Sequence, residues 1–197
     1  MKNEQYPNGF RVTVYAGSSF GASPEFSREA ERFITDVVSS GAEIVYGGGK
    51  VGLMGVVAKA ALAAGGKVTG VIPRALTNAE VSHTSLSALH IVDSMATRKR
   101  LMEDLGNCFV ALPGGIGTIE ETIEVLSNLI LGHHKKPIFL LNVNRYWDRL
   151  LDLMAHVVES GFANSLEGKL LMRINSNAEL LDELRQWSPP RPRWGES

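Results

Sequence analysis

The segment C-F-V-A-L-P-G-G-I-G-T-I-E-E-T-I-E-V-L-S-N-L-I-L, residues 108–131, contains a strand, a turn and a helix in direct succession. Residues 108–112 form a short apolar run that is typical of a buried strand. Three glycines follow within five residues, and from Thr118 the apolar residues recur at the spacing of a helix. The helical stretch has apolar residues on two faces. It therefore needs two packing partners, either both within this chain or one from a second subunit.

The rest of the chain repeats this alternation. We expect further strands over residues 12–16, 43–46, 67–72, 89–92 and 137–141, and helices over residues 24–40, 52–64, 95–105, 118–131, 146–160 and 178–186. Short apolar strands that alternate with helices are typical of a parallel sheet covered on both sides. The sequence predicts a doubly wound, Rossmann-like α/β fold. We expect a single domain over residues 1–187 and a loose tail over residues 188–197.

Composition excludes several classes of protein. The chain has 197 residues, 44% of them hydrophobic, and 20 basic against 21 acidic side chains give a formal net charge of -1. A dedicated nucleic-acid binder usually has an excess of basic residues, so we do not expect this protein to bind nucleic acid. The single cysteine, Cys108, excludes an internal disulfide and suits a reducing compartment. With neither an apolar signal segment nor a membrane-spanning run, the expected location is the cytoplasm.

Three glycine clusters each follow a predicted strand and precede a predicted helix. They begin at Gly17, Gly47 and Pro113. In a parallel sheet these strand ends share one edge, where ligands bind. Glycines allow backbone amides to approach an anion, and the helix N-terminus adds a favourable partial charge. The need for a tight turn would explain any one of these clusters. A site for a phosphate-bearing ligand would explain all three together. No cluster has the closing Gly-Lys-Ser/Thr of a nucleoside triphosphatase.

Charged residues near these clusters are few. Glu120 and Glu121 are expected in the first turn of the helix from Thr118, and successive helical residues point about 100° apart. One acid can therefore face the ligand while the other pairs outward. Arg98 begins a basic run near the start of another helix, where cations oppose the helix dipole, so we expect an anionic ligand to favour it.

Two motifs together resemble those of the Lonely Guy (LOG) family of cytokinin riboside 5′-monophosphate phosphoribohydrolases, often mislabelled lysine decarboxylases. Residues 93–99 read D-S-M-A-T-R-K, which contains M-x-x-R-K, and residues 113–121 read P-G-G-I-G-T-I-E-E, which fits P-G-G-x-G-T-x-x-E. Residues 47–55 also match the family's G-G-G-x-x-G-L-M-G. The similarity extends from about Val12 to about Phe162.

The resemblance implies hydrolysis of the N-glycosidic bond of a nucleoside 5′-monophosphate, with Arg98 and Glu121 as the catalytic pair. A carboxylate near the anomeric carbon would stabilise the positive charge that develops on the sugar and would activate water. Family members are commonly homodimers and need no metal and no cofactor. The residues expected to contact the nucleotide lie in the motifs and glycine clusters: Gly17, Ser18, Gly48, Glu80, Met95, Lys99, Pro113, Gly114, Gly115, Ile116, Gly117, Thr118, Ile119, Glu120 and Ser127.

The sequence departs from the family pattern beside the second motif. Residues 127–137 read S-N-L-I-L-G-H-H-K-K-P where the family usually reads T-W-A-Q-L-G-I-H-x-K-P, and Ile116 replaces a frequent tyrosine. The nucleobase therefore stays open between AMP and a prenylated cytokinin nucleotide.

Two alternatives differ in class. A non-catalytic carrier of a nucleotide or molybdenum cofactor would use the same loops without needing both Arg98 and Glu121. A lysine decarboxylase would need a lysine that forms a Schiff base, and Lys50 and Lys99, the lysines nearest the glycine clusters, lack a context for it.

Overall fold

The structure is a computed structural model that describes residues 5–77 and 86–191. Within these ranges the strands are β1 (Arg11–Tyr15), β2 (Glu43–Tyr46), β3 (Val68–Pro73), β4 (Ala88–Val92), β5 (Cys108–Ala111), β6 (Ile138–Leu141) and β7 (Leu171–Ile174). The α-helices are α1 (Pro24–Ser39), α2 (Gly52–Ala63), α4 (Met95–Leu105), α5 (Ile116–Ile130), α6 (Asp148–Glu159) and α7 (Asn177–Gln186). Short 3₁₀ turns are η1 (Arg74–Leu76), η2 (Val143–Arg145) and η3 (Glu167–Lys169).

The strands form one sheet in the order β4-β3-β2-β1-β5-β6-β7, and neighbouring strands run parallel. From β1 the chain moves outward through β2, β3 and β4, then returns so that β5 pairs with β1, with Val12 opposite Cys108. The direction of winding reverses between β1 and β5, and this is the place where such sheets bind ligands.

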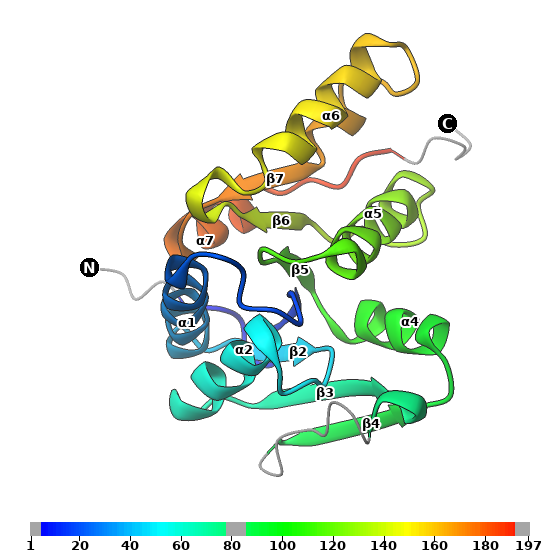
Figure 1. The fold of residues 1–197 in the computed structure, drawn as a ribbon. Coiled ribbons are helices and arrows are strands. Elements are labelled where there is room, and N and C mark those ends of the chain that lie inside the picture. The colour runs from blue at the N-terminus through cyan, green and yellow to red at the C-terminus, as the bar shows by residue number, and fades with distance from the viewer. Residues whose placement is uncertain (1–4, 78–85, 192–197) are drawn as a thin grey trace.

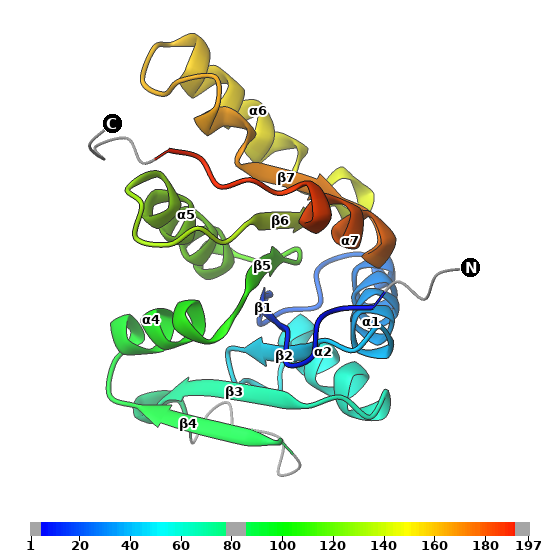
Figure 2. The same ribbon diagram turned by 180° about the vertical axis from the view of Figure 1, so that it is seen from behind.

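Helices cover both faces of the sheet (Figures 1 and 2). On one face α1, α2 and α7 enclose a core that includes Phe33, Leu53 and Leu180. On the other face α4, α5 and α6 enclose a core that includes Met102 and Trp147. Apolar area removed from water on both faces supplies the main stabilisation. The doubly wound, Rossmann-like fold expected from the sequence is confirmed.

The helix N-termini are of two kinds. Serine side chains cap α1, α4 and α7, as when Ser94 Oγ accepts the Thr97 amide at 3.1 Å. The residues before α2, α5 and α6 make no side-chain cap bond. At α2 the first amides donate instead to backbone carbonyls of the loop after β1. Unbonded amides at a helix start are available to other acceptors. The N-terminus of α5, which follows a glycine cluster, is open in this sense.

Several expected boundaries are wrong. Strand β7 is absent from the prediction, because a four-residue strand containing Arg173 gives little apolar signal. Helix α5 begins at Ile116 rather than Thr118, so Glu120 and Glu121 lie in its second turn. Helix α6 begins at Asp148, which leaves the two preceding residues in a turn. The predicted tail is described only to residue 191, so the division at residue 187 stays a prediction.

Candidate active site

Two of the three glycine clusters are in direct contact. The Gly17 amide, after β1, donates to the Pro113 carbonyl, after β5, at 3.2 Å. A Cβ on Gly17 would lie 3.0 Å from the Gly114 Cα, and one on Gly114 would lie 2.2 Å from Thr118 Oγ1. Side chains at either glycine would force the loops apart, so glycine is required by this close approach.

A cavity of about 290 Å³ opens between these loops and the N-terminal part of α4. Its volume is at the lower end for small-molecule sites. Backbone of both glycine loops forms one side, and apolar side chains from α2, η1 and α4 form part of the other. The lining residues are Ala16, Gly17, Ser18, Met54, Leu76, Met95, Arg98, Gly115, Ile116, Gly117, Thr118, Glu120 and Glu121.

Arg98, on α4, is buried in the wall of this cavity. Its guanidinium donates to the Val71 carbonyl at 3.1 Å, to the Gly47 carbonyl at 3.2 Å and to Glu121 Oε1 at 3.1 Å. Gly47 permits this arrangement, because a Cβ there would lie 1.8 Å from Arg98 Nη2. The protein itself thus supplies three acceptors for Arg98, and contact of Arg98 with an anionic ligand stays a prediction.

Glu121, on α5, is also buried, with 7% of its surface exposed. Burial raises its carboxyl pKa to about 7, although the nearby Arg98 guanidinium acts in the opposite direction. Arg98 holds Oε1, whereas Oε2 has no hydrogen-bond partner within the described chain. A carboxyl with a pKa near neutrality can both accept and release a proton.

The neighbouring acid behaves differently. Glu120 forms an ion pair with Lys99, and Lys99 also lies 2.7 Å from Glu124. These two acids raise the Lys99 pKa by hydrogen bonding, which keeps its ammonium charged. Both acids line the cavity, but Glu121 is buried against Arg98 whereas Glu120 pairs with Lys99. That only Glu121 meets the ligand stays a prediction.

The predicted nucleotide contacts divide into groups. Gly17, Ser18, Met95 and most of residues 115–121 line the cavity. Six others do not. Pro113 and Gly114 line a neighbouring cavity instead. Lys99 is bound to its acids, Ile119 packs into the core, Gly48 lies against Ile72, and Ser127 is exposed about 9 Å along α5 from Glu121. Glu80 lies outside the described residues. Their contact with a nucleotide stays a prediction.

The sequence did not reveal that the Arg98 guanidinium lies against Gly47, or that Met54 and Leu76 line the cavity. The G-G-G cluster signalled that this loop mattered, but it did not show which glycine meets a side chain from α4.

A second cavity of about 260 Å³ lies across the glycine loops and shares Gly17, Ser18 and Gly115 with the first. Pro113 and Gly114 form part of its wall. Aromatic side chains enclose the rest: Phe20, Phe26 and Tyr146. The glycine loops therefore separate a charged cavity from a mainly apolar one.

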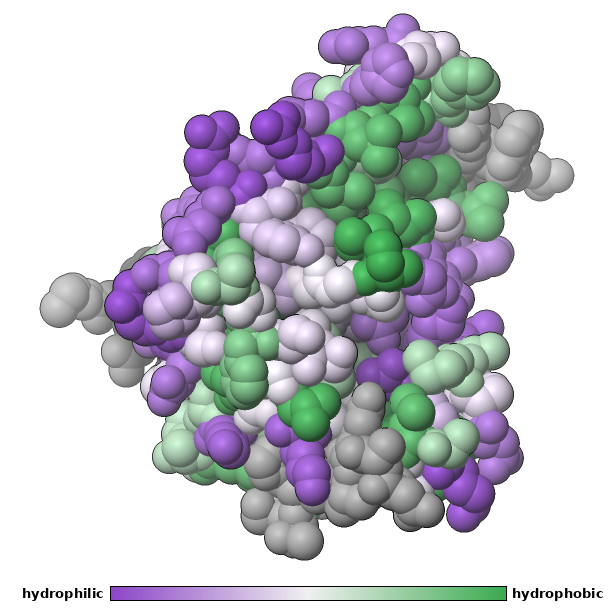
Figure 3. All heavy atoms as spheres, viewed as in Figure 1, coloured by the Kyte–Doolittle hydropathy of each residue, from purple (hydrophilic) through white to green (hydrophobic). Residues whose placement is uncertain are grey.

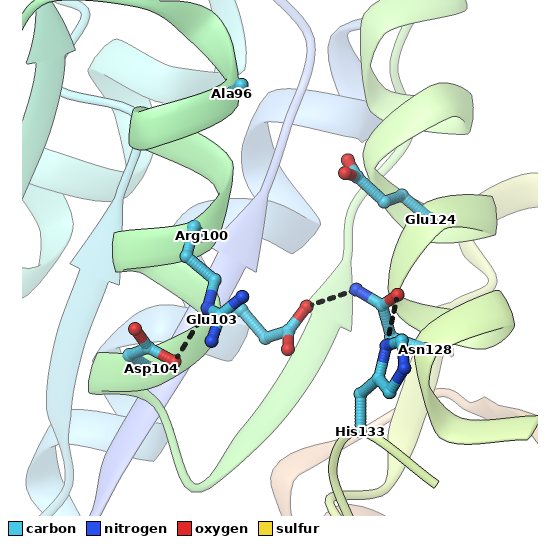
Figure 4. Close-up of a pocket in the computed structure, with 7 residues that line it drawn as sticks. All are labelled: Ala96, Arg100, Glu103, Asp104, Glu124, Asn128 and His133. Carbon is cyan, nitrogen blue, oxygen red and sulfur yellow. Dashed lines mark hydrogen bonds and ion pairs between the residues drawn. The ribbon is translucent and has the colours of Figure 1, made fainter. Parts of the chain in front are cut away.

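A larger cavity, about 580 Å³, lies elsewhere between α4 and α5 (Figure 4). Several of its polar side chains bond to one another: Glu103 Oε2 accepts from Asn128 Nδ2 at 2.7 Å, and Arg100 lies 3.5 Å from Asp104. It contains neither a glycine loop nor the Arg98–Glu121 pair. Size alone therefore does not identify the site.

The described ranges contain no group of three or more His, Cys, Asp or Glu side chains placed to hold a metal ion. Among their helices, none combines the length and apolarity needed to cross a membrane.

Fold and site together define a Rossmann-like α/β protein in which glycine loops and a buried arginine–glutamate pair line one cavity. A family model described as "Possible lysine decarboxylase" matches residues 54–184. The chain belongs to this family, the LOG family, as the motif resemblance predicts. A cytokinin riboside 5′-monophosphate phosphoribohydrolase of Rhodococcoides fascians is 45% identical over 157 residues, 79% of each chain. One from Arabidopsis thaliana is 36% identical over 91% of this chain and 82% of its own.

Solved structures share the fold at lower identity. The molybdenum cofactor carrier protein of Chlamydomonas reinhardtii superimposes with a TM-score of 0.69 and 19% identity, covering 90% of this chain and 96% of the carrier. The molybdenum cofactor binding protein of Rippkaea orientalis gives 0.66 and 21%, with coverages of 90% and 96%. At these identities the likeness extends to the fold alone.

Proposed function

We propose that this protein hydrolyses the N-glycosidic bond of a nucleoside 5′-monophosphate to release the free base and ribose 5-phosphate. The observation that carries this proposal is the buried Arg98–Glu121 pair beside the open N-terminus of α5. The names of the relatives at 36–45% identity support the same reaction.

The 5′-phosphate would bind at the start of α5. Amides there have no side-chain cap, and the helix dipole favours an anion. Thr118, which is buried beside Gly114, adds a hydroxyl at the same place. Since Glu121 lies on the same helix five residues after Ile116, a phosphate bound at the loop would bring the ribose toward its carboxylate.

Glu121 would act as the general base. Water attacks the anomeric carbon, the carbon–nitrogen bond breaks with its electron pair going to the base, and one proton of the water ends on the departing base. The carboxylate also stabilises positive charge on the ribose in the transition state. A pKa of about 7 suits this exchange near neutral pH. Arg98 positions Glu121 by holding Oε1.

Apolar side chains around the cavity support a nucleotide with an apolar substituent on its base. Met95, 43% exposed, and Ile116, 81% exposed, both line the cavity, where they would contact an apolar substituent of the base. We propose a prenylated cytokinin nucleotide as the preferred substrate and AMP as a second substrate.

Incubation with isopentenyladenosine monophosphate, AMP and adenosine, with the products separated by chromatography, tests this function. We expect free base and ribose 5-phosphate from both nucleotides, more rapidly from the prenylated one, and no cleavage of adenosine, which lacks the phosphate. A nucleotide that stays bound and intact would favour the carrier function of the structural neighbours.

The decarboxylase alternative has less support. A Schiff-base lysine must lose its proton to attack a carbonyl, whereas Glu120 and Glu124 keep Lys99 protonated. Lys50 is exposed outside the cavity.

We also propose a homodimer formed through α5 and α6. Of α6, which the structure describes in full, no residue is fully buried: Leu150, Leu151 and Met154 pack only partly against the core, and Leu153 is exposed. Figure 3 shows a broad hydrophobic surface over this part of the molecule. Light scattering should report twice the 21.4 kDa chain mass, and Leu153→Glu should lower this mass, since Leu153 is 51% exposed.

A cytoplasmic location is proposed because the lone, buried Cys108 suits a reducing compartment.

A further inference from the structure

Tyr146 contacts the glycine loop from a distant part of the chain. It follows η2, and its hydroxyl donates a hydrogen bond to the carbonyl of Gly114, 32 residues earlier. The ring is held edge-on against Phe26 of α1, with centroids 5.9 Å apart, and against Trp147, at 4.9 Å. Two aromatic contacts therefore fix the direction in which the hydroxyl points.

The backbone before Tyr146 is strained. Asn144 and Arg145 have φ values of 50° and 60°, the left-handed region that residues with a Cβ seldom adopt. Such strain persists only where the surroundings determine the conformation. Asn142 supplies part of that constraint: its Oδ1 accepts the Trp147 amide at 2.8 Å, and its Nδ2 donates to Asp148 Oδ1 at 2.7 Å.

The hydrogen bond from Tyr146 orients a peptide of the site. In a trans peptide the carbonyl of one residue and the amide of the next point in opposite directions. Because Tyr146 holds the Gly114 carbonyl, the Gly115 amide points away from Tyr146. Gly115 is the N-cap of α5, makes no side-chain cap bond and lines the cavity with Glu121.

The preceding peptide is fixed in the same way. The Pro113 carbonyl accepts the Gly17 amide at 3.2 Å, which orients the Gly114 amide. Gly114 has no side chain that could hold the loop, and a Cβ there would clash with Thr118. External hydrogen bonds therefore replace side-chain packing in this loop.

We propose that Tyr146 is a positioning residue for the phosphate-binding loop: its hydroxyl holds the Gly114–Gly115 peptide so that the Gly115 amide is available to the 5′-phosphate. The inference rests on the proposed function. The loop contacts the phosphate in both substrate and transition state, and loss of such uniform binding raises KM and leaves kcat nearly unchanged.

Tyr146→Phe tests this role because it keeps the ring contacts and removes only the hydroxyl. We expect KM for AMP to rise about three- to tenfold, the range of one lost hydrogen bond, with kcat within about twofold of wild type. Inhibition by ribose 5-phosphate should weaken by the same factor, and inhibition by free adenine should not change. Tyr6→Phe is the matched control, since it removes a buried tyrosine hydrogen bond to Asn177 Oδ1 far from the site. It should lower the melting temperature without changing KM.

Binding separates failure of this inference from failure of the proposed function. If wild type releases no base, the phosphoribohydrolase is wrong, but calorimetric affinities for AMP and adenosine still test Tyr146. We expect Tyr146→Phe to lose affinity for AMP and to keep its affinity for adenosine. An AMP affinity equal to that of wild type, or an equal loss for both ligands, would overturn the positioning role.

Discussion

Two ion pairs join α4 to α5 one residue apart, and they differ in burial and in the acceptors around them. Arg98 and Glu121 have side chains 10% and 9% exposed, and two backbone carbonyls complete the guanidinium's bonds. Lys99 and Glu120 are 19% and 51% exposed, and a second acid, Glu124, shares the lysine. Burial raises the pKa of Glu121 to about 7. The inner pair, Arg98–Glu121, is therefore suited to proton transfer, and the outer pair, Lys99–Glu120, is suited to holding the two helices together.

The largest effect is expected from Arg98→Met. At pH 8 Glu121 is ionised and would lose its partner, so we expect about 3–5 kcal/mol less unfolding free energy and loss of measurable activity. At pH 5 the carboxyl takes up a proton and the destabilisation should shrink. Arg100→Met, on the exposed side of α4, should change stability by less than about 0.5 kcal/mol. Chemical denaturation of both variants at the two pH values decides whether burial distinguishes them.

Gly47→Ala should disable the inner pair without altering either charge. The new Cβ would lie 1.8 Å from Arg98 Nη2 and would push the guanidinium away from Glu121. We expect about a 10²-fold loss of kcat/KM, as for other small displacements of catalytic groups. Because Arg98→Met has no measurable activity, the two backgrounds are compared by unfolding free energy. Gly47→Ala should lower this free energy less in the Arg98→Met background than in wild type, because its target is gone. Equal costs in both backgrounds would show that Gly47 does not act through Arg98.

Stability should depend on pH through Glu121. Its pKa is about 7 in the folded chain against 4.5 ordinarily, so the folded state holds this proton more tightly. The stabilisation is complete below about pH 4.5 and is lost as pH rises through 7. The unfolding free energy of wild type should therefore fall relative to Glu121→Gln by up to about 3 kcal/mol across this interval. Parallel pH profiles for the two proteins would contradict the raised pKa.

The smallest effect is expected from Lys99→Met, which removes the outer pair. Partly exposed ion pairs contribute about 1 kcal/mol or less, and salt screens them. The melting temperature of wild type should approach that of the variant as salt is added. A destabilisation as large as that of Arg98→Met would abolish the distinction between the two pairs.

Much of the fold could be predicted from the sequence, because apolar strands and glycine turns are local signals. Strand β7 escaped because its four residues include Arg173 and carry a weak pattern. The different directions of Glu120 and Glu121 followed from helix geometry. The motif resemblance, rather than any local pattern, singled out Arg98 and Glu121.

The rest of the site depends on contacts between distant residues. Arg98 rests on Gly47, 51 residues away, and Tyr146 reaches Gly114 across 32 residues. No local pattern reports such pairings. The carbonyls that accept from Arg98 lie on β3 and in the loop after β2, and only the folded chain brings them to the guanidinium. From the sequence alone, an anionic ligand is therefore the partner that the basic run indicates.

The most direct test compares Glu121→Gln with Glu120→Gln in the base-release assay, with AMP binding measured for both. The two changes are chemically identical and adjacent on α5. We predict that Glu121→Gln binds AMP but loses about 10³-fold in kcat, within the range of a lost general base, and that Glu120→Gln stays within tenfold of wild type. Near-normal turnover by Glu121→Gln, or equal losses in the two variants, would contradict the assignment of the chemistry to the inner pair.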